Sequence, residues 1–365
     1  MQDVYVIAEV GVNHNGSFEL AKQLIDEAKN AGANAVKFQT FVTENCLSKS
    51  ISKASYQVTN TGSGTQFDMV KELELSFKEH NQLKAYCDEQ DIDYMSTAFD
   101  FDSLAFLVGE LNLKTLKIAS GEVTNAPLVL AHAQTGCDII LSTGMCTLGD
   151  IEKALGVLAF GFIGDTSITP SDTAFTQAYF SDEGQALIKE RVTILHCTTE
   201  YPAPFDEINL KAINTIQRAF GTKIGYSDHS QGITVPIMAV AFGVTMIEKH
   251  FTLDKAMEGP DHIASLDPRE LNDMISGIRQ GQSAIGGAFK RPSVSELGNL
   301  ALVRKVILAN QNIKKGEVFT KENLSIKRGV GMITPTDYWA LLGRKSHRDY
   351  AHDEPLVNEL DGIED

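Results

Sequence analysis

Two histidines in the second half of the chain could hold a metal ion. His229 and His250 lie 21 residues apart, and each stands at the end of a short apolar run. If these runs are neighbouring strands, both imidazoles reach the same rim, and two imidazoles at matched positions indicate a divalent-metal site. Only two protein ligands are obvious, so positions stay open for water and substrate, which favours a Lewis-acid site over a structural zinc.

Carboxylates near these histidines could complete the metal site. They could add oxygen ligands or orient the imidazoles, and they are Glu9, Asp228, Glu248 and Asp261. A mixed nitrogen and oxygen environment suits manganese, magnesium or zinc, and the residues do not choose among these metals.

Two lysines lie inside otherwise apolar runs. Lys37 and Lys117 would be costly to bury unless each meets an anion. Hydroxyl side chains end the same or neighbouring runs, and they are Thr97, Ser120, Ser142 and Ser227. Charge and hydroxyl donors that converge in this way favour an anion site for phosphate or carboxylate. A Schiff-base lysine, as in barrel aldolases, is one alternative, and lysines that extend to solvent at the rim are the other.

A third group of polar residues suits a ligand with many hydroxyl groups. Its members are Glu9, Gln39, Glu122, Tyr201 and Asp261. Glu9 and Glu122 could also act as a general acid and a general base.

Eight apolar runs carry most of these residues at their ends. The runs are VYVIAE, NAVKFQ, DYMST, TLKIAS, DIILST, VTILHC, KIGYSDH and VTMIEKH. Helix-length amphipathic stretches separate most of them; the first begins after Asn15-Gly16 with Ser17 as N-cap and ends at Gly32. Strand–helix alternation repeated eight times predicts an α/β fold, a (β/α)8 TIM barrel with its active site at the C-terminal ends of the strands.

The pattern divides the chain into three parts. We expect the barrel over residues 1–284, a linker over 285–301, and a small β-rich domain over 302–365. Two stretches depart from the barrel pattern. Residues 41–66 lie on the catalytic face, as a lid over the substrate or as a mobile loop. Residues 161–181 lie at the opposite face, where we expect a peripheral decoration or an oligomer contact.

Composition excludes several classes of partner. The 365 residues carry a formal net charge of −16, which argues against nucleic acid or an anionic membrane surface as a partner. No apolar run approaches the ~18–20 residues that cross a bilayer and no signal peptide is evident, so we expect a cytoplasmic protein. The five cysteines show no paired spacing, and a disulfide framework is not expected. Cys197 follows His196 directly, so their side chains point to opposite faces of a strand and do not form a nucleophilic pair.

Several segments together resemble a known family. They are IAEVGVNHNGS, GANAVKFQTF, KIASGEVTNAPL, ILSTGM, HCTTEYPAPF, IGYSDHSQG, and IEKHFTLD followed by GPDHIASLDP. They are similar, in order, to segments of the bacterial N-acetylneuraminate (sialic acid) synthase family, and KKGEVFTKENLSIKRGVG resembles its C-terminal antifreeze-like (SAF) domain. One departure is Thr199, which stands where some members of the family have Asn.

The resemblance implies a reaction and its participants. Phosphoenolpyruvate would condense with an N-acylated amino sugar, typically N-acetylmannosamine, to give N-acetylneuraminate and phosphate by C–O cleavage. His229 and His250 would hold manganese, which would polarise the open-chain aldehyde, and Glu9 would be a further catalytic residue. Phosphoenolpyruvate would be held by Lys37, Thr97, Lys117, Ser120, Ser142 and Ser227. The sugar would meet Gln39, Glu122, Tyr201, Asp261 and, from the partner subunit of a domain-swapped homodimer, the residue equivalent to Arg328.

Three other functions stay open. Members of the same family make legionaminic or pseudaminic acid, and a legionaminic acid synthase acting on a 2,4-diacetamido-2,4,6-trideoxymannose is the main alternative. A Schiff-base aldolase would be trapped by borohydride at Lys37 or Lys117 in the presence of pyruvate. A non-catalytic sugar-acid binding protein would bind its ligand without releasing phosphate.

Overall fold

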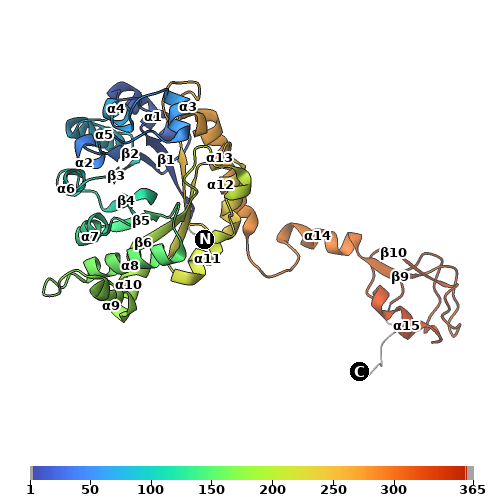
Figure 1. Ribbon diagram of the computed structural model, residues 1–365. Helices are drawn as coiled ribbons and strands as arrows, with labels where there is room; N and C mark the ends of the chain where they lie inside the picture. The colour runs from blue at the N-terminus through green and yellow to red at the C-terminus, as the bar shows by residue number, and fades with distance from the viewer. Residues whose placement is uncertain (1–2, 358, 360–365) are drawn as a thin grey trace. The chain divides into compact units, whose positions relative to one another are not determined.

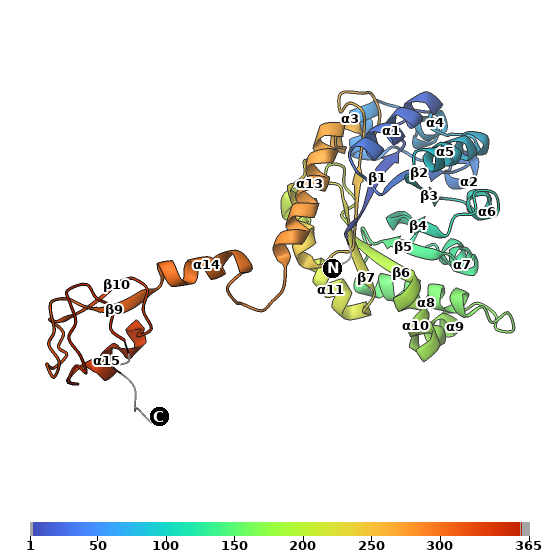
Figure 2. The same cartoon turned by 180° about the vertical axis from the view of Figure 1, so that it is seen from behind.

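The computed structural model describes residues 3–357 and 359. The chain divides into two compact units, residues 1–286 and residues 287–365, and each is described by itself. Figures 1 and 2 show both units from opposite sides.

The first unit is a closed barrel of parallel strands. The strands follow one another around the barrel in chain order, and β8 closes it by pairing with β1. Their bounds are β1 (Tyr5–Gly11), β2 (Ala35–Thr40), β3 (Asp93–Ala98), β4 (Thr115–Ile118), β5 (Asp138–Ser142), β6 (Val192–His196), β7 (Lys223–Asp228) and β8 (Met246–His250). The predicted (β/α)8 barrel is confirmed.

Helices cover the outside of the barrel (Figures 1 and 2). The main helices that follow the eight strands in turn are α1 (Phe18–Asn30), α5 (Phe77–Glu89), α6 (Phe101–Gly109), α7 (Ala126–Gln134), α8 (Leu148–Ile163), α11 (Ala212–Phe220), α12 (Thr234–Ala239) and α13 (Pro268–Ile285). The first begins where the sequence predicts, because the Ser17 hydroxyl accepts a hydrogen bond from the Leu20 N–H at 3.3 Å. Leu24 and Ile25 of α1 are buried in the layer between helices and strands.

The barrel interior is layered. One layer near the N-terminal ends of the strands is apolar and consists of Ile7, Ala35, Met95, Ile140 and Leu195. Side chains alternate between the two faces of a strand, so the next inward position lies two residues further along. On four of these strands that position holds Glu9, Lys37, Thr97 and Ser142. The apolar layer therefore closes the floor of the barrel, and the polar residues lie directly above it.

The segment after β2 is more structured than a loop. Residues 41–66 contain α2 (Thr43–Cys46) and α3 (Ser55–Thr61), and α4 (Gln66–Glu72) follows. The side-chain amide of Asn60 donates to the carbonyl of Pro260 at 2.7 Å, and the rings of Tyr56 and Tyr201 lie 5.4 Å apart. The segment is thus held against loops at the C-terminal ends of β6 and β8.

The stretch 161–181 is largely helical. It comprises the end of α8 and the first helix of a peripheral helical hairpin, α9 (Asp172–Phe180). The second helix of the hairpin, α10 (Asp182–Arg191), follows the stretch and leads into the start of β6. A cavity of about 420 Å³ lies between α7, α8 and α9, and Phe175 and Tyr179 are among its lining residues. The hairpin precedes β6, so it lies away from the C-terminal ends of the strands.

The second unit is small and rich in β structure. The second half of the predicted linker is helical, because α14 spans Val294–Val303. The unit continues with β9 (Lys305–Ala309), antiparallel β10 (Leu324–Arg328) and α15 (Tyr338–Leu341), around a core that includes Ile307 and Phe319. Across the described parts of both units, we find no helix with the length and apolar character that a membrane span requires.

Candidate active site

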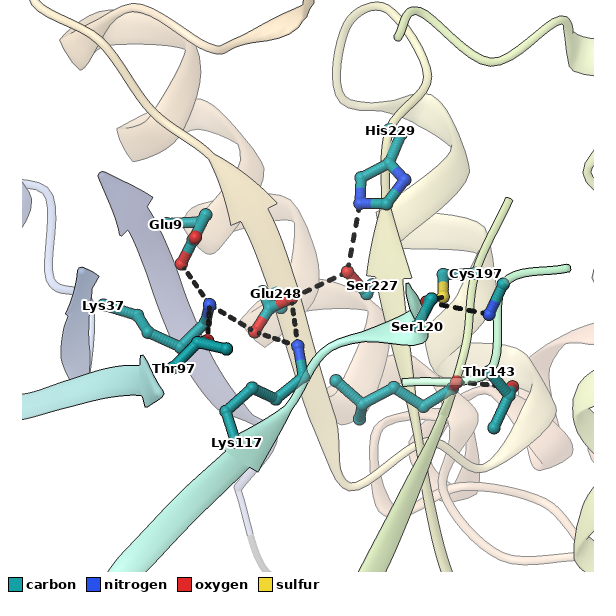
Figure 3. A network of polar contacts seen from close by, with 12 residues as sticks. Glu9, Lys37, Thr97, Lys117, Ser120, Thr143, Cys197, Ser227, His229 and Glu248 are labelled. Atoms are coloured by element: carbon teal, nitrogen blue, oxygen red, sulfur yellow. Dashed lines mark hydrogen bonds and ion pairs between the residues drawn. The ribbon is translucent and has the colours of Figure 1, made fainter. Parts of the chain in front are cut away.

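Four charged side chains meet inside the barrel just above its apolar floor (Figure 3). Lys37 Nζ lies 2.6 Å from Glu9 Oε2 and 3.6 Å from Glu248 Oε2. Lys117 Nζ donates to both oxygens of Glu248, at 2.7 and 3.0 Å. All four residues are almost completely buried. Two lysines and two carboxylates from β1, β2, β4 and β8 therefore form one compact buried ion cluster.

The cluster shifts the pKa values of its members in different directions. Burial raises the pKa of Glu9 to about 7, although Lys37 opposes this shift. Burial also acts on Glu248, but Lys117 and Lys37 outweigh it and hold the pKa of this carboxyl far below its usual range. At Lys37 the two carboxylates outweigh burial and raise the pKa, whereas burial lowers the pKa of Lys117. Glu9 is therefore the carboxyl of the cluster that titrates near neutrality.

Two of the four predicted hydroxyl groups, those of Thr97 and Ser227, hydrogen-bond to the ion cluster. Lys37 donates to Thr97 Oγ1 at 3.2 Å, and Ser227 donates to Glu248 Oε1 at 2.8 Å. Ser120 accepts a hydrogen bond from the backbone N–H of Gly144 at 2.9 Å. The hydroxyl of Ser142 is buried and has no hydrogen-bond partner in the described part of the chain. A buried hydroxyl without a partner fits a site that a polar ligand completes.

The two histidines lie together at the rim above the cluster. Their ring centroids are 5.7 Å apart. Nδ1 of His229 lies 2.5 Å from the carbonyl oxygen of Thr198, which can only accept, so this nitrogen carries the proton and Nε2 keeps its lone pair. The Nε2 atom faces the hydroxyls of Ser227 and Tyr201, each at 3.3 Å. Burial lowers the pKa of His229 to about 4 and that of His250 well below its usual range, so both rings are neutral at pH 7.

Neutral imidazoles fixed in this way are suitable metal ligands. Nδ1 of His250 is buried and has no hydrogen-bond partner among residues 3–357 and 359, which leaves it for a group outside the chain. No cluster of three or more histidine, cysteine or acidic side chains with metal-binding geometry occurs in the same residues. The arrangement fits an open two-histidine site, in which substrate and water supply the other ligands.

A cavity of about 270 Å³ opens beside the histidines. The predicted sugar-binding residues Gln39, Tyr201 and Asp261 line it together with His250. Burial raises the pKa of Asp261 to about 6. Three of the five predicted sugar-binding residues thus share one cavity with a histidine of the candidate metal site.

Two protein-family models match the chain. The model of the NeuB family matches residues 24–290, and that of the SAF domain matches residues 304–359. The chain belongs to the NeuB family. The resemblance noted from the sequence is confirmed, and so is the SAF domain that follows the barrel.

Two curated relatives of this NeuB-family chain are named as legionaminic acid synthases. An N,N'-diacetyllegionaminic acid synthase of Campylobacter jejuni is 44% identical over 98% of this chain and 100% of its own length. A protein of the same name from Legionella pneumophila is 40% identical over 93% of this chain and 90% of its own length. The chain is therefore an enzyme of the nonulosonic acid synthase type.

Solved structures agree with this assignment. A sialic acid synthetase from Leptospira borgpetersenii, crystallised with citrate, superposes with a TM-score of 0.66 at 32% identity, over 82% of this chain and 90% of that one. The spore coat polysaccharide biosynthesis protein SpsE of Bacillus subtilis superposes with a TM-score of 0.60 at 29% identity, over 100% of this chain and 96% of that one.

Two of the carboxylates considered as metal ligands have other partners. Asp228 is completely buried, and it pairs with Lys249 at 2.6 Å on the outer face of the barrel. Its neighbours Ser227 and His229 point inward, so alternation along the strand turns Asp228 away from the site. Glu248 points inward, but it is bound to both lysines and to Ser227. The structure therefore contradicts Asp228 as a ligand and gives Glu248 the role of counter-ion.

The two other predicted sugar-binding residues belong to different units of the chain. Glu122 belongs to the short 3-10 turn Ser120–Glu122 and accepts a hydrogen bond from the side chain of Asn125 at 2.7 Å. Arg328 ends β10 in the second unit and is exposed.

Sequence reasoning missed part of the site. Tyr56 and Gln57 on α3 line the cavity, together with apolar residues from α2 and α4. The sequence contains a sign of this lining. Leu47, Met69 and Val70 are apolar residues within or beside a mostly polar segment, which indicates that part of the segment packs against the barrel.

Proposed function

We propose that this synthase condenses phosphoenolpyruvate with open-chain 2,4-diacetamido-2,4,6-trideoxymannose to give N,N'-diacetyllegionaminic acid and phosphate. The sequence motifs alone suggested N-acetylmannosamine first and this sugar as the alternative. The relatives favour the alternative, because legionaminic acid synthases are 44% and 40% identical, whereas a pseudaminic acid synthase of C. jejuni is 30% identical and the human N-acetylneuraminate-9-phosphate synthase 28%.

The buried ion cluster is the observation that carries the proposal. Phosphoenolpyruvate has a phosphate and a carboxylate, and it needs cations inside a cavity that excludes water. Lys37 and Lys117 supply two cations, which Glu9 and Glu248 hold in place. The hydroxyls of Thr97, Ser120, Ser142 and Ser227 supply further donors, and that of Ser142 is still unpaired.

His229 and His250 would hold the metal, for which we propose manganese. A bound divalent metal would polarise the aldehyde oxygen of the sugar as a Lewis acid. The Thr198 carbonyl keeps the Nε2 lone pair of His229 directed toward the site. Tyr201 stacks on His229, with ring centroids 4.2 Å apart, and orients the ring further.

The chain's own residues then manage charge and protons. C3 of phosphoenolpyruvate forms a bond to the aldehyde carbon as the C2–C3 double bond and the carbonyl double bond open. The aldehyde oxygen becomes an alkoxide that takes up a proton from solvent, and the positive charge that develops at C2 would be stabilised by the ionised Glu248 of the cluster. Water adds to C2 and loses a proton to Glu9, whose pKa of about 7 suits a general base. Collapse of the tetrahedral intermediate breaks the C2–O bond and releases phosphate, and Lys37 and Lys117 neutralise the departing charge.

A Schiff-base aldolase is the rival enzyme. Its nucleophile is a neutral amine, whereas Lys37 and Lys117 are both paired with carboxylates, and the pKa of Lys37 is raised. Borohydride should therefore trap no pyruvate adduct. A covalent adduct at Lys117, whose pKa burial lowers, would support the aldolase instead.

One assay tests the proposal directly. Protein with manganese and phosphoenolpyruvate is offered the trideoxy sugar and N-acetylmannosamine separately, and phosphate release is followed. Phosphoenolpyruvate labelled with ¹⁸O in the bridging position should yield labelled phosphate, because the C–O bond breaks. If neither sugar leads to phosphate release, the synthase proposal is refuted. If only N-acetylmannosamine leads to phosphate release, the proposed sugar is refuted.

A matched set of histidine variants tests the metal site. His229→Ala and His250→Ala should abolish metal-dependent activity and weaken Mn²⁺ binding. His196→Ala is the control, because His196 ends β6 but bonds to the carbonyl of Ile208. Full activity in both site variants would remove the metal assignment.

We further propose a homodimer in which Arg328 reaches the sugar of the partner subunit. Exposed apolar side chains lie near Arg328 in sequence, and they are Val330, Met332 and Trp339. Complementation tests the exchange. Mixed dimers of Arg328→Ala and His229→Ala subunits should regain activity, because one of their two sites would have both residues intact. Activity no higher than that of either parent would refute the exchange.

A further inference from the structure

The lining of the sugar cavity contains a polar group of side chains and a packed apolar cluster, which we take as its polar end and its apolar end. Gln39, Tyr201, His250 and Asp261 form the polar end beside the metal site. The other end, the apolar wall, consists of Val12, Phe41, Leu47, Met69, Val70, Leu73 and Phe99. We propose that the apolar wall selects a sugar whose distal carbons carry methyl groups in place of hydroxyls.

The apolar wall is a built feature of the fold. Val12, Phe41, Met69 and Leu73 form a buried cluster of their own, and Val70 and Phe99 pack against it. The rings of Phe41 and Phe99 meet edge to face, with centroids 6.3 Å apart. The Thr61 hydroxyl at the end of α3 donates to the sulfur of Met69 on α4, at 3.4 Å. The segment after β2 thus places apolar side chains over one end of the cavity and fixes them there.

The direction of the substrate follows from the proposed function, on which this inference rests. The aldehyde carbon must lie at His229 and His250, so the chain of carbons runs from the polar end toward the apolar wall. The distal carbons C4 to C6 are then the part that meets the wall. The trideoxy sugar presents an acetamido methyl at C4 and a methyl at C6, whereas N-acetylmannosamine presents hydroxyls at both positions.

The wall discriminates because it has few groups that can pair with a hydroxyl. Gln57 and Gln66 are the amides that line this part of the cavity. The side-chain oxygen of Gln57 already accepts from the backbone N–H of Ala54 at 3.0 Å. We assign the Gln66 amide, which lines the cavity, to the single acetamido group at C4. A hydroxyl at C6 would lose its water without a replacement, and an apolar pocket rejects such an added hydroxyl by roughly 100-fold.

A hydroxyl introduced into the wall should weaken this preference. Val70→Thr replaces one methyl by a hydroxyl at nearly constant volume. We expect the ratio of kcat/KM for the trideoxy sugar to that for N-acetylmannosamine to fall about tenfold. Val58→Thr is the matched control, because Val58 lies on α3, is 46% exposed and does not line the cavity. The control should keep the wild-type ratio.

A second variant guards against an unfolded protein. Leu47→Asn changes a half-buried wall residue at the edge of the segment and should shift the ratio in the same direction. An unchanged KM for phosphoenolpyruvate shows that the barrel site is intact. Wild-type ratios in both wall variants would overturn the inference while leaving the synthase in place. A preference of the wild-type enzyme for N-acetylmannosamine would also overturn the inference. If the wild-type enzyme releases no phosphate with either sugar, the proposed function itself is refuted.

Discussion

A buried ion pair outside the catalytic cavity should control the stability of the barrel and its affinity for metal. Lys249 Nζ lies 2.6 Å from Asp228 Oδ2, both side chains are completely buried, and the lysine also donates to the carbonyl of Ser230. Asp228 accepts further bonds from the Tyr226 hydroxyl at 2.9 Å and from the backbone N–H of Ser230 at 3.0 Å. Each partner directly precedes a proposed metal ligand, His250 or His229.

Lys249→Met removes the cation and leaves a buried carboxylate without its counter-ion. The expected loss of unfolding free energy is about 3–5 kcal/mol. In a unit of this size such a loss lowers the Tm on the order of 10 °C. Adding Asp228→Asn removes the unpaired buried charge. The double variant should therefore lose less unfolding free energy than the two single variants lose together.

Urea unfolding and Mn²⁺ titration by electron paramagnetic resonance measure the two effects. Lys255→Met is the matched control, because Lys255 pairs with Glu270 at 2.7 Å but both side chains are partly exposed, and such pairs contribute about 0–1 kcal/mol. We expect Lys249→Met to weaken Mn²⁺ binding by about 10–100-fold, as loss of groups that support metal ligands commonly does. Equal stability and equal Mn²⁺ affinity in the two variants would refute the reasoning.

Three other changes have defined outcomes. Glu248→Gln leaves Lys117 without its carboxylate, so inorganic phosphate should raise the Tm of this variant more than that of the wild type; equal shifts would contradict the anion site. In Gly144→Ala the new methyl would lie 2.1 Å from Thr199 Oγ1 and 2.9 Å from Ser120 Oγ, so these side chains or the loop must shift. The KM for phosphoenolpyruvate should then rise at least several-fold in steady-state assays. Burial lowers the pKa of His80 to about 4. As the pH falls from about 6.5 to 4, His80 therefore binds a proton in the unfolded chain but not in the folded one. The free energy of unfolding should decrease by about 3 kcal/mol over that window. Urea unfolding at several pH values should show a shallower loss in His80→Gln, and an identical loss would exclude His80 as a source.

The positions of the barrel strands and of the site residues on them follow from short-range patterns. An apolar run of four to seven residues with a polar residue at its end is enough to place Lys37, Lys117 and His250 at the C-terminal face. The two-residue period then separates the inward residues from the outward ones. The same period, applied to Asp228 between Ser227 and His229, would have excluded it as a ligand from the sequence alone.

The ion cluster could not be predicted in the same way. Lys117 and Glu248 are 131 residues apart, and only closure of the barrel brings β4 and β8 to opposite sides of one narrow interior. A buried lysine in the sequence indicates an anion nearby, and the substrate is the anion that the sequence suggests. The protein supplies its own anions, Glu9 and Glu248, from strands whose inward positions were read as metal or sugar ligands.

The charges on β7 and β8 also specify the register of this strand pair next to the two proposed metal ligands. Ser227 stands opposite Glu248 and Asp228 opposite Lys249, so the inner face carries one polar pair and the outer face carries another. A slip of one residue would turn every side chain to the other face of the sheet. Asp228 would enter the ion cluster, Lys249 would lose its partner, and one histidine would leave the site. A slip of one residue therefore leaves a buried charge without a partner. The Asp228–Lys249 pair thus favours the alignment that brings His229 and His250 to one rim.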